Sequence, residues 1–235
     1  MRLLITRPQP DAGEIATELE RRGHRCVIAP LMTVVTHAVD LPLSGVQALL
    51  LTSRNGVRAL AAATPRRDIP VLAVGPGTAA AAADEGFSVE AGAGDVAALG
   101  SLVRAALKPG AGPLLWITGK HIRGDLRADL RAAGYDVARH ILYDAQTVSA
   151  LPPSCAAALQ AHEIDGALFF SPRTAQTFVR ILAMASLEPT VKSVTAFCLS
   201  PAVAAALASL PWQRIEIAGR TDRDALLDLA GGPAP

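Results

Sequence analysis

The sequence is poor in aromatic residues, in net charge and in long apolar runs, and each shortage excludes a class of protein. Phe, Trp and Tyr make up 4% of the 235 residues although 51% are hydrophobic, which favours helices packed on a sheet over a β-sandwich. The formal net charge of +1 gives no broad attraction to polyanions, so we expect no nucleic acid partner. Since no apolar run approaches the length of a membrane span, we also expect no membrane partner.

Cysteine is scarce as well. Cys26, Cys155 and Cys198 lie far apart and form no CxxC pair, which is typical of reduced core thiols in a cytoplasmic protein. The N-terminal LLIT run is too short for the core of a signal peptide, which favours the same location. The five histidines show neither an i,i+4 pair nor ligand spacing, so we expect no metal site.

Three common functional motifs are missing. The sequence contains no GxGxxG after its first apolar run, no GxxxxGK[ST] and no GxSxG. These absences disfavour a dinucleotide cofactor, nucleotide hydrolysis and a hydrolase of the nucleophile-elbow type. We expect a site that binds anions without a cofactor.

What the sequence does contain is a regular alternation of short apolar runs and alanine-rich helical stretches. The first helix is expected near Asp11–Arg22, with Ile15 and Leu19 on its buried face and Gly23 just after its end. Such alternation predicts parallel sheets flanked by helices. Strands are expected at Leu3–Thr6, Cys26–Ala29, Ala48–Thr52, Val71–Val74, Leu114–Thr118, Ala167–Phe170 and Thr195–Leu199.

The same segments occur twice. LERRGHRCVIAPL returns as LRAAGYDVARHIL, LLLTSRNGVRAL as ALFFSPRTAQTF, VLAVGPGTAAAAADEGF as VTAFCLSPAVAAALASL, and AGAGDVAAL as AGRTDRDAL. Four matches in one order indicate an internal duplication, and we expect the two copies to face each other across a cleft.

Two polar, β-branched stretches lie outside the repeats and predict extended connectors, 34–37 and 141–146. If they pair, one lobe comprises 1–33 plus 147–235 and the other comprises 38–140. A simple split near Gly110-Ala111-Gly112 is the alternative, because that stretch resembles a linker. No heptad pattern calls for a partner chain, so we expect a monomer.

Candidate ligand residues follow the expected strands, since ligands of open α/β sheets bind beyond the carboxyl ends of the strands. Arg7, Arg54 and Arg173 stand directly after strands, where the dipole of the next helix disfavours positive charge; a ligand role would explain them. The other candidates are hydroxyl, glycine and basic residues at these turns: Thr52, Ser53, Gly75, Thr78, Gly119, Lys120, Arg123, Ser171 and Ser200.

Simpler roles stay open for several of these residues. Ser53, Ser171 and Thr78 are ordinary N-cap types. Lys120 and Arg123, with Arg127, are also typical of a solvated face. His121 lies near this basic group, where a surface position is expected.

Taken in order, these segments resemble the uroporphyrinogen-III synthase family. The likeness covers nearly the whole chain and rests on LLITRP, LLLTSRNGVRAL, AVGPGTAAAA, AGDVAAL, LLWITGKHIRGDLRADLRAAGYDV, ILYDAQ, FFSPRTAQTF and AGRTDRDALL. It implies two α/β lobes joined by a two-stranded ladder, with the N-terminal segment in the C-terminal lobe. It also implies a linear tetrapyrrole substrate, hydroxymethylbilane, which loses water and closes with inversion of its last pyrrole through a cationic intermediate, without a cofactor.

The resemblance implies roles for particular residues. Tyr143 in ILYDAQ matches the tyrosine proposed to assist departure of the hydroxyl, although a packed hinge tyrosine is the simpler interpretation. Thr78 matches a substrate-contacting threonine, and Ser53 and Ser171 match paired serines at strand ends.

One turn departs from the family pattern and keeps other functions open. Relatives usually carry a Gly-Pro-Thr-Thr type turn where this chain has Ser200-Pro201-Ala202-Val203, so two hydroxyls are missing. A two-lobed protein of the same fold that binds an anionic ligand or has a regulatory role, and that catalyses no reaction, is therefore an alternative. A nucleotide-sugar transferase fits the architecture but lacks donor-binding signatures.

Overall fold

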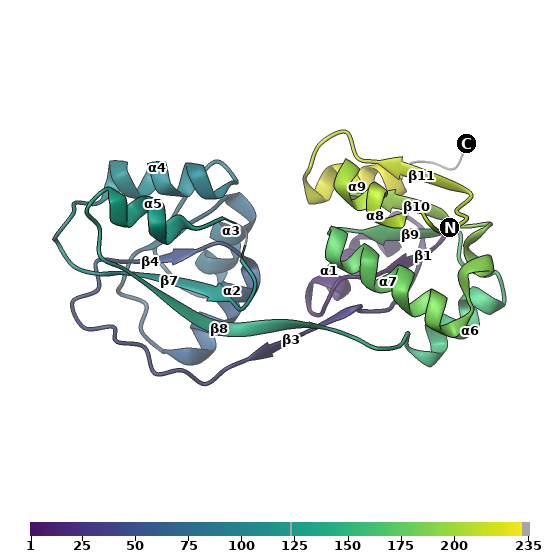
Figure 1. Ribbon diagram of the computed structural model, residues 1–235, viewed down its shortest axis with the longest axis horizontal. Helices are drawn as coiled ribbons and strands as arrows, with labels where there is room; N and C mark the ends of the chain where they lie inside the picture. The colour runs from purple at the N-terminus through teal and green to yellow at the C-terminus, as the bar shows by residue number, and fades with distance from the viewer. Residues whose placement is uncertain (123, 232–235) are drawn as a thin grey trace. The chain divides into compact units, whose positions relative to one another are not determined.

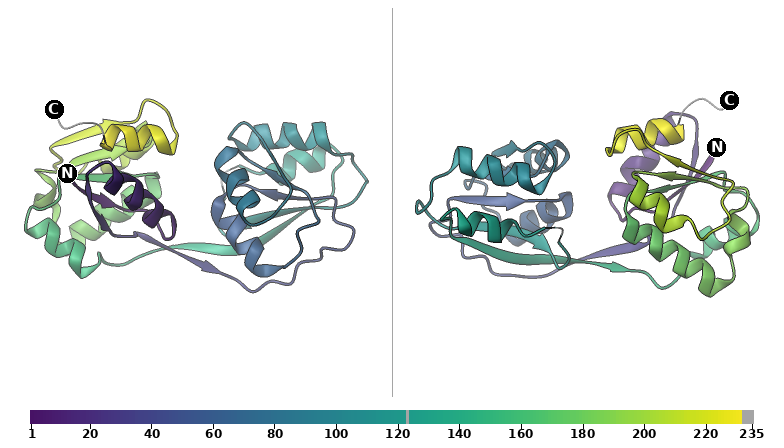
Figure 2. Two further views of the ribbon diagram at one scale, coloured as in Figure 1. Left: turned by 180° about the vertical axis from the view of Figure 1, so that it is seen from behind. Right: turned by 45° about the horizontal axis from the view of Figure 1, so that its top comes forward.

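The computed structural model describes residues 1–122 and 124–231. The chain forms two compact units, Met1–Thr33 with Gln146–Pro235 and Val34–Ala145. Each unit is a parallel sheet between two layers of helices (Figures 1 and 2). The predicted α/β class, with two similar lobes, is confirmed. Among the described residues, no helix is both long enough and apolar enough to span a membrane.

The first unit contains a sheet in the order β11-β10-β9-β1-β2, in which every pair is parallel. Its strands are β1 (Arg2–Ile5), β2 (Arg25–Ile28), β9 (Gly166–Phe169), β10 (Thr195–Cys198) and β11 (Arg214–Ile217). Its helices are α1 (Asp11–Arg21), α6 (Pro153–Gln160), α7 (Pro172–Ala185), α8 (Pro201–Leu207) and α9 (Arg223–Gly231), with a 3-10 helix η1 (Glu188–Val191).

Side chains of the central strands alternate between the two faces of this sheet, so each face has its own core. Phe169 on β9 packs in the layer that contains α6, α7 and α8, where its ring centroid lies 5.2 Å from that of Phe178. Leu168, the preceding residue, points into the layer of α1 and α9. All four residues of β9 are buried, as expected for a strand covered on both faces.

The second unit contains the order β3-β8-β7-β4-β5-β6, and its pairs from β8 to β6 are parallel. Its strands are β3 (Met32–Thr36), β4 (Ala48–Leu51), β5 (Val71–Ala73), β6 (Val89–Ala91), β7 (Leu114–Gly119) and β8 (Val137–Thr147). Its helices are α2 (Arg54–Ala63), α3 (Pro76–Asp84), α4 (Val96–Ala106) and α5 (Leu126–Ala132). Helices α2 and α3 share one core, and α4 and α5 share the other.

The two sheets are permuted copies of each other. The order β2-β1-β9-β10-β11 in one unit matches β8-β7-β4-β5-β6 in the other, so the N-terminal strands complete the sheet of the C-terminal segment. Equivalent positions of the two copies have the same structural role. Ser53 and Ser171 cap α2 and α7, and Gly23 and Gly134 both have φ of +85°. That φ is in the left-handed region where glycine is favoured after a helix.

The predicted connectors are strands that pair with each other. Strands β3 and β8 are neighbours in the sheet, and the His37 amide donates to the Leu142 carbonyl at 2.8 Å. Strand β8 is longer than expected because it begins as a sheet strand beside β7 and continues to Thr147. The Gly110–Gly112 stretch is a loop between α4 and β7 within one unit, so the alternative split there is wrong.

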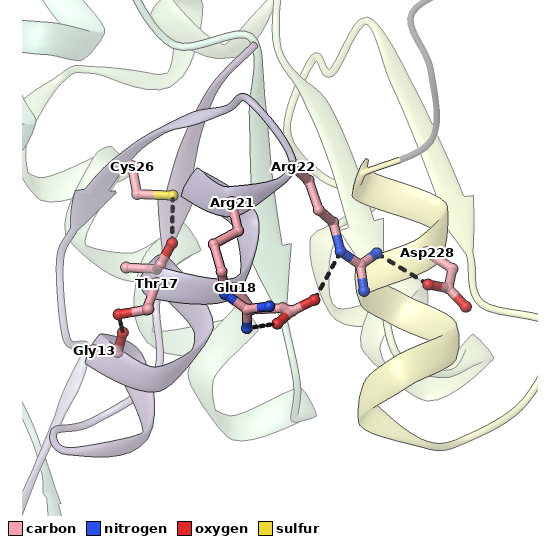
Figure 3. Close-up of polar contacts among 8 residues, drawn as sticks. Gly13, Thr17, Glu18, Arg21, Arg22, Cys26 and Asp228 are labelled. Atoms are coloured by element: carbon pink, nitrogen blue, oxygen red, sulfur yellow. Dashed lines mark hydrogen bonds and ion pairs between the residues drawn. The ribbon is translucent and has the colours of Figure 1, made fainter.

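Helices α1 and α9 lie against the same face of the first sheet and share an ion-pair network (Figure 3). Arg22 donates to Glu18 at 3.0 Å and to Asp228 at 2.9 Å. The Asp228 side chain is 67% exposed, so the network orients the helix ends and adds little to the stability of the fold.

Candidate active site

A pocket of about 490 Å³ opens in the second unit, at the carboxyl ends of β4, β5 and β7. Parallel strands and the helix starts that follow them meet at this edge, which is where open α/β sheets bind ligands. The lining residues come from five strand or loop segments: Thr52, Ser53, Val74, Gly94, Asp95, Val96, Trp116, Gly119, His121, Ile122 and Tyr143.

A hydrogen bond between two predicted site residues lies in the pocket wall. The Tyr143 hydroxyl lies 2.8 Å from Ser53 Oγ. Ser53 also accepts the Gly56 amide at 3.0 Å as the N-cap of α2. Since the serine oxygen accepts the amide, its own proton is available to the phenol oxygen, or the phenol can donate to it. The capping role and the site role therefore coexist at Ser53.

Gly119 lets the tyrosine ring reach this position. It ends β7 beside Tyr143 on β8, at a register shift between Thr118 and Gly119. A Cβ on Gly119 would lie 2.6 Å from Tyr143 Cε2 and 2.7 Å from Cζ. Glycine is thus required here for close approach of a ring.

Arg139 on β8, which no sequence pattern singled out, holds the loop that follows β7. Its guanidinium donates to the carbonyls of Gly119 and Lys120, both at 2.9 Å, and its Nε donates to Thr118 Oγ1 at 2.9 Å. The backbone amide of Lys120 also donates to the Tyr143 carbonyl at 2.9 Å. Lys120 itself is exposed and does not line the pocket.

His121 and Asp144 form a second polar pair at the same site. His121 lines the pocket with its side chain 62% exposed, and its Nε2 lies 4.0 Å from Asp144 Oδ1. The Asp144 side chain is 13% exposed, and its Oδ1 is buried with no hydrogen-bond partner among the described residues. Asp95 adds a carboxylate nearby as the N-cap of α4.

The other described candidates of this unit do not line the pocket. Gly75 caps α3, and a Cβ there would lie 2.8 Å from the Cα of Gly94, so the loop backbone fills the space that we expected a ligand to approach. Thr78 is 8% exposed and does not line the pocket. Arg54 is the first residue of α2 and is half-buried. Arg123 lies outside the described residues.

Four candidates belong to the first unit. Ser171 caps α7 and its Oγ lies 2.8 Å from Thr174 Oγ1. Arg173 is in the first turn of the same helix. Arg7 forms an ion pair with Asp11 and lies over the ring of Phe170, 5.0 Å from its centroid.

Ser200, the fourth, is the N-cap of α8 and makes no side-chain capping bond to the described residues. It begins the turn that departs from the family pattern.

Permuted parallel sheets with a hydroxyl-lined pocket at one carboxyl edge define a two-domain α/β protein with a candidate ligand site at its strand ends. The family model described as uroporphyrinogen-III synthase HemD matches residues 13–228. The chain belongs to the uroporphyrinogen-III synthase family.

Solved structures show the same fold. The chain is similar to the uroporphyrinogen-III synthetase of Helicobacter pylori, with a TM-score of 0.67 and 20% identity over 98% of both chains. A mutant uroporphyrinogen III synthase of Thermus thermophilus aligns with a TM-score of 0.52 and 20% identity, over 98% of this chain and 96% of that one. No curated protein sequence matches the chain.

Proposed function

We propose that this protein cyclises hydroxymethylbilane to uroporphyrinogen III, with loss of water and inversion of the terminal pyrrole ring. Membership of the family, over residues 13–228, supports this reaction class, a cyclising lyase. The observation that carries the mechanism is the Tyr143 hydroxyl, which lines the pocket and lies 2.8 Å from Ser53 Oγ.

Loss of water from a hydroxymethyl group needs an acid. The C–O bond breaks as the oxygen takes a proton, and the electron pair leaves with the water. Tyr143 donates this proton from its hydroxyl. Ser53 then donates its own hydrogen bond to the phenol oxygen, which stabilises the developing negative charge. The carbon left behind is a cation delocalised onto the pyrrole nitrogen, and the Asp95 carboxylate on the pocket wall favours it electrostatically.

The size and the lining residues of the pocket indicate which part of the substrate enters it. The volume of about 490 Å³ is in the usual range for a small-ligand site and suits one or two pyrroles of the four. Its described lining residues include hydroxyls and the carboxylate of Asp95 but no lysine or arginine. We therefore place the hydroxymethyl end here and the acetate and propionate groups outside it.

Those carboxylates need donors, which the candidate residues outside the pocket provide. Arg7, Arg54, Arg173 and Lys120 are suited to bind carboxylates as charged donors, and backbone amides at the starts of α7 and α8, near Ser171 and Ser200, suit anions as well. Bringing the two ends of the linear substrate together is then catalysis by proximity. In this proposal Thr52, Gly75 and Thr78 shape the strand ends around the substrate.

We propose further that the protein acts as a monomer in the cytoplasm, without a nucleic acid or membrane partner. The three cysteines are free thiols, which is consistent with a reducing compartment.

A ligand-binding protein of the same fold without turnover is the second candidate. The turn after β10 favours it, because Ala202 is exposed without a hydroxyl and Val203 is buried at 1%. Such a protein would bind the tetrapyrrole and leave its cyclisation to the spontaneous route.

The test is turnover of freshly generated hydroxymethylbilane. The products are oxidised and the uroporphyrin isomers are separated by chromatography. A predominance of the type III isomer is expected, at a rate above that of the reaction without protein. Formation of the type I isomer alone, at the spontaneous rate, would reject the enzyme in favour of the binding protein.

A further inference from the structure

We propose that His121, oriented by Asp144, is the base that removes the last proton in the reaction. This inference rests on the proposed cyclisation. His121 and Tyr143 line the same pocket, and the two residues come from the loop after β7 and from β8. The pair places a proton donor for the hydroxymethyl end and a proton acceptor for the terminal pyrrole in one pocket, where the two ends of the substrate have to meet.

The geometry assigns the two imidazole nitrogens different tasks. Nε2 is the nitrogen that lies 4.0 Å from Asp144 Oδ1, and that oxygen is buried without a hydrogen-bond partner among the described residues. A small rotation of an exposed imidazole gives this oxygen a partner, and such contacts often shorten when substrate binds. With its proton on Nε2, the ring presents Nδ1 as an acceptor to the pocket.

The surrounding charges favour an orienting role for the carboxylate. Asp144 faces the ring from β8, and Asp95, the N-cap of α4, also lines the pocket. In the described part of the chain, two positive groups stand near this loop: Lys120, which is exposed, and Arg139, whose guanidinium is held by the carbonyls of Gly119 and Lys120. Since the guanidinium is engaged by these carbonyls, the Asp144 carboxylate is left to orient the imidazole.

The reaction itself requires such a base. The hydroxyl leaves with one proton from Tyr143, and the cationic carbon bonds to the substituted α-carbon of the terminal pyrrole. To invert that pyrrole, its bond to the neighbouring methylene carbon breaks, and the methylene carbon, now cationic, forms a new bond to the unsubstituted α-carbon of the same pyrrole. When the ring is closed, the α-carbon of the terminal pyrrole gives up its hydrogen as a proton and keeps the electron pair to restore the aromatic pyrrole. His121 Nδ1 accepts this proton. One proton given and one taken leave the enzyme with unchanged net charge once the two groups re-equilibrate through solvent.

The experiment is replacement of His121 by Ala, with kinetics of isomer III formation and chemical rescue. Loss of a general base lowers kcat by about 100-fold, and imidazole added to the assay restores part of it, because the exposed position leaves an open space. A purely structural role would not respond to added imidazole. His37→Ala is the matched control, as His37 is an exposed histidine of the same unit; it should retain wild-type kcat.

Asp144→Asn tests the orienting contact separately. We expect a kcat lowered by about 10-fold and a change in the His121 tautomer, read from ¹⁵N chemical shifts of the ring. If His121→Ala keeps wild-type kcat while the wild-type protein forms the type III isomer, the assignment of His121 is overturned and the proposed cyclisation stands. If the wild-type protein forms the type I isomer alone, the proposed function fails, and this inference fails with it.

Discussion

Replacing Gly119 by Ala should damage catalysis by moving the tyrosine ring. The added Cβ would lie 2.6 Å from Tyr143 Cε2, 2.7 Å from Cζ and 3.1 Å from the hydroxyl oxygen. Because ordinary carbon contacts begin near 3.5 Å, the ring has to retreat by about 1 Å. That shift breaks the 2.8 Å contact with Ser53 and withdraws the proton donor from the substrate.

A displacement of this size at a reacting group lowers turnover by as much as about 100-fold. The stability cost is smaller, about 1 kcal/mol for a lost hydrogen bond, since the end of a side chain can move without the backbone. The measurements are kcat for type III formation and the midpoint of thermal unfolding. We expect a large fall in kcat with a small fall in Tm.

The chain offers a matched control at Gly77. A Cβ there would meet no described atom within 4 Å, and the residue is in the first turn of α3, where alanine is at least as favourable as glycine. Gly77→Ala should therefore keep wild-type kcat and Tm. If the Gly119→Ala variant keeps wild-type kcat, turnover does not require the Tyr143 hydroxyl in its position beside Ser53.

Three other predictions concern single groups. Tyr143→Phe should lower kcat by about 100-fold with little change in Tm, and an unchanged kcat would remove the phenol from the mechanism. Burial raises the pKa of Cys155 and of Cys198 to about 12, so neither should react with iodoacetamide at pH 8 before the protein unfolds; rapid labelling of the native protein, read by mass spectrometry, would contradict this. Desolvation lowers the pKa of His140 below its ordinary value of 6.5. As the pH falls, the imidazole is therefore protonated in the unfolded state before it is protonated in the folded state. The free energy of unfolding should decrease as pH falls below about 6.5. His140→Gln should flatten that decline in Tm between pH 7 and 5, and an unchanged slope would exclude His140 as its source.

Much of the fold was predictable because the two copies of the duplication carry the same helix caps and the same alternation of strands and helices. Ser53, Ser171 and Asp95 are N-caps in the structure, and each stands in a segment that the sequence repeats. The strands at Val89–Ala91 and Arg214–Ile217 were missed, because both are edge strands of mixed polarity whose side chains are partly exposed. Their position is determined by pairing with β5 and β10, which no local pattern reveals.

The site was predicted in part. Ser53, Gly119 and Tyr143 line one pocket, as residues at neighbouring strand ends should. Arg139 and Asp144 were missed, because they lie within a strand and their roles depend on contacts across the sheet, to Gly119 and to His121. Sequence order places residues at strand ends, but the cross-strand partner of each polar group depends on register.

The duplication also shows what replaces the proposed proton donor in the other unit. Tyr143 follows Gly134 by the same interval by which Met32 follows Gly23, so Met32 is its counterpart in the first unit. There Ser171 Oγ lies 2.8 Å from Thr174 Oγ1, which in turn donates to Met32 Sδ at 3.6 Å.

Met32 is 9% exposed, and its thioether is a weak acceptor with no proton to give. The serine caps remain in both copies because they stabilise helices. In the proposed mechanism the phenol is required once, since one hydroxyl leaves per substrate. A methionine beside a capping serine then leaves that end of the first unit suited to binding alone.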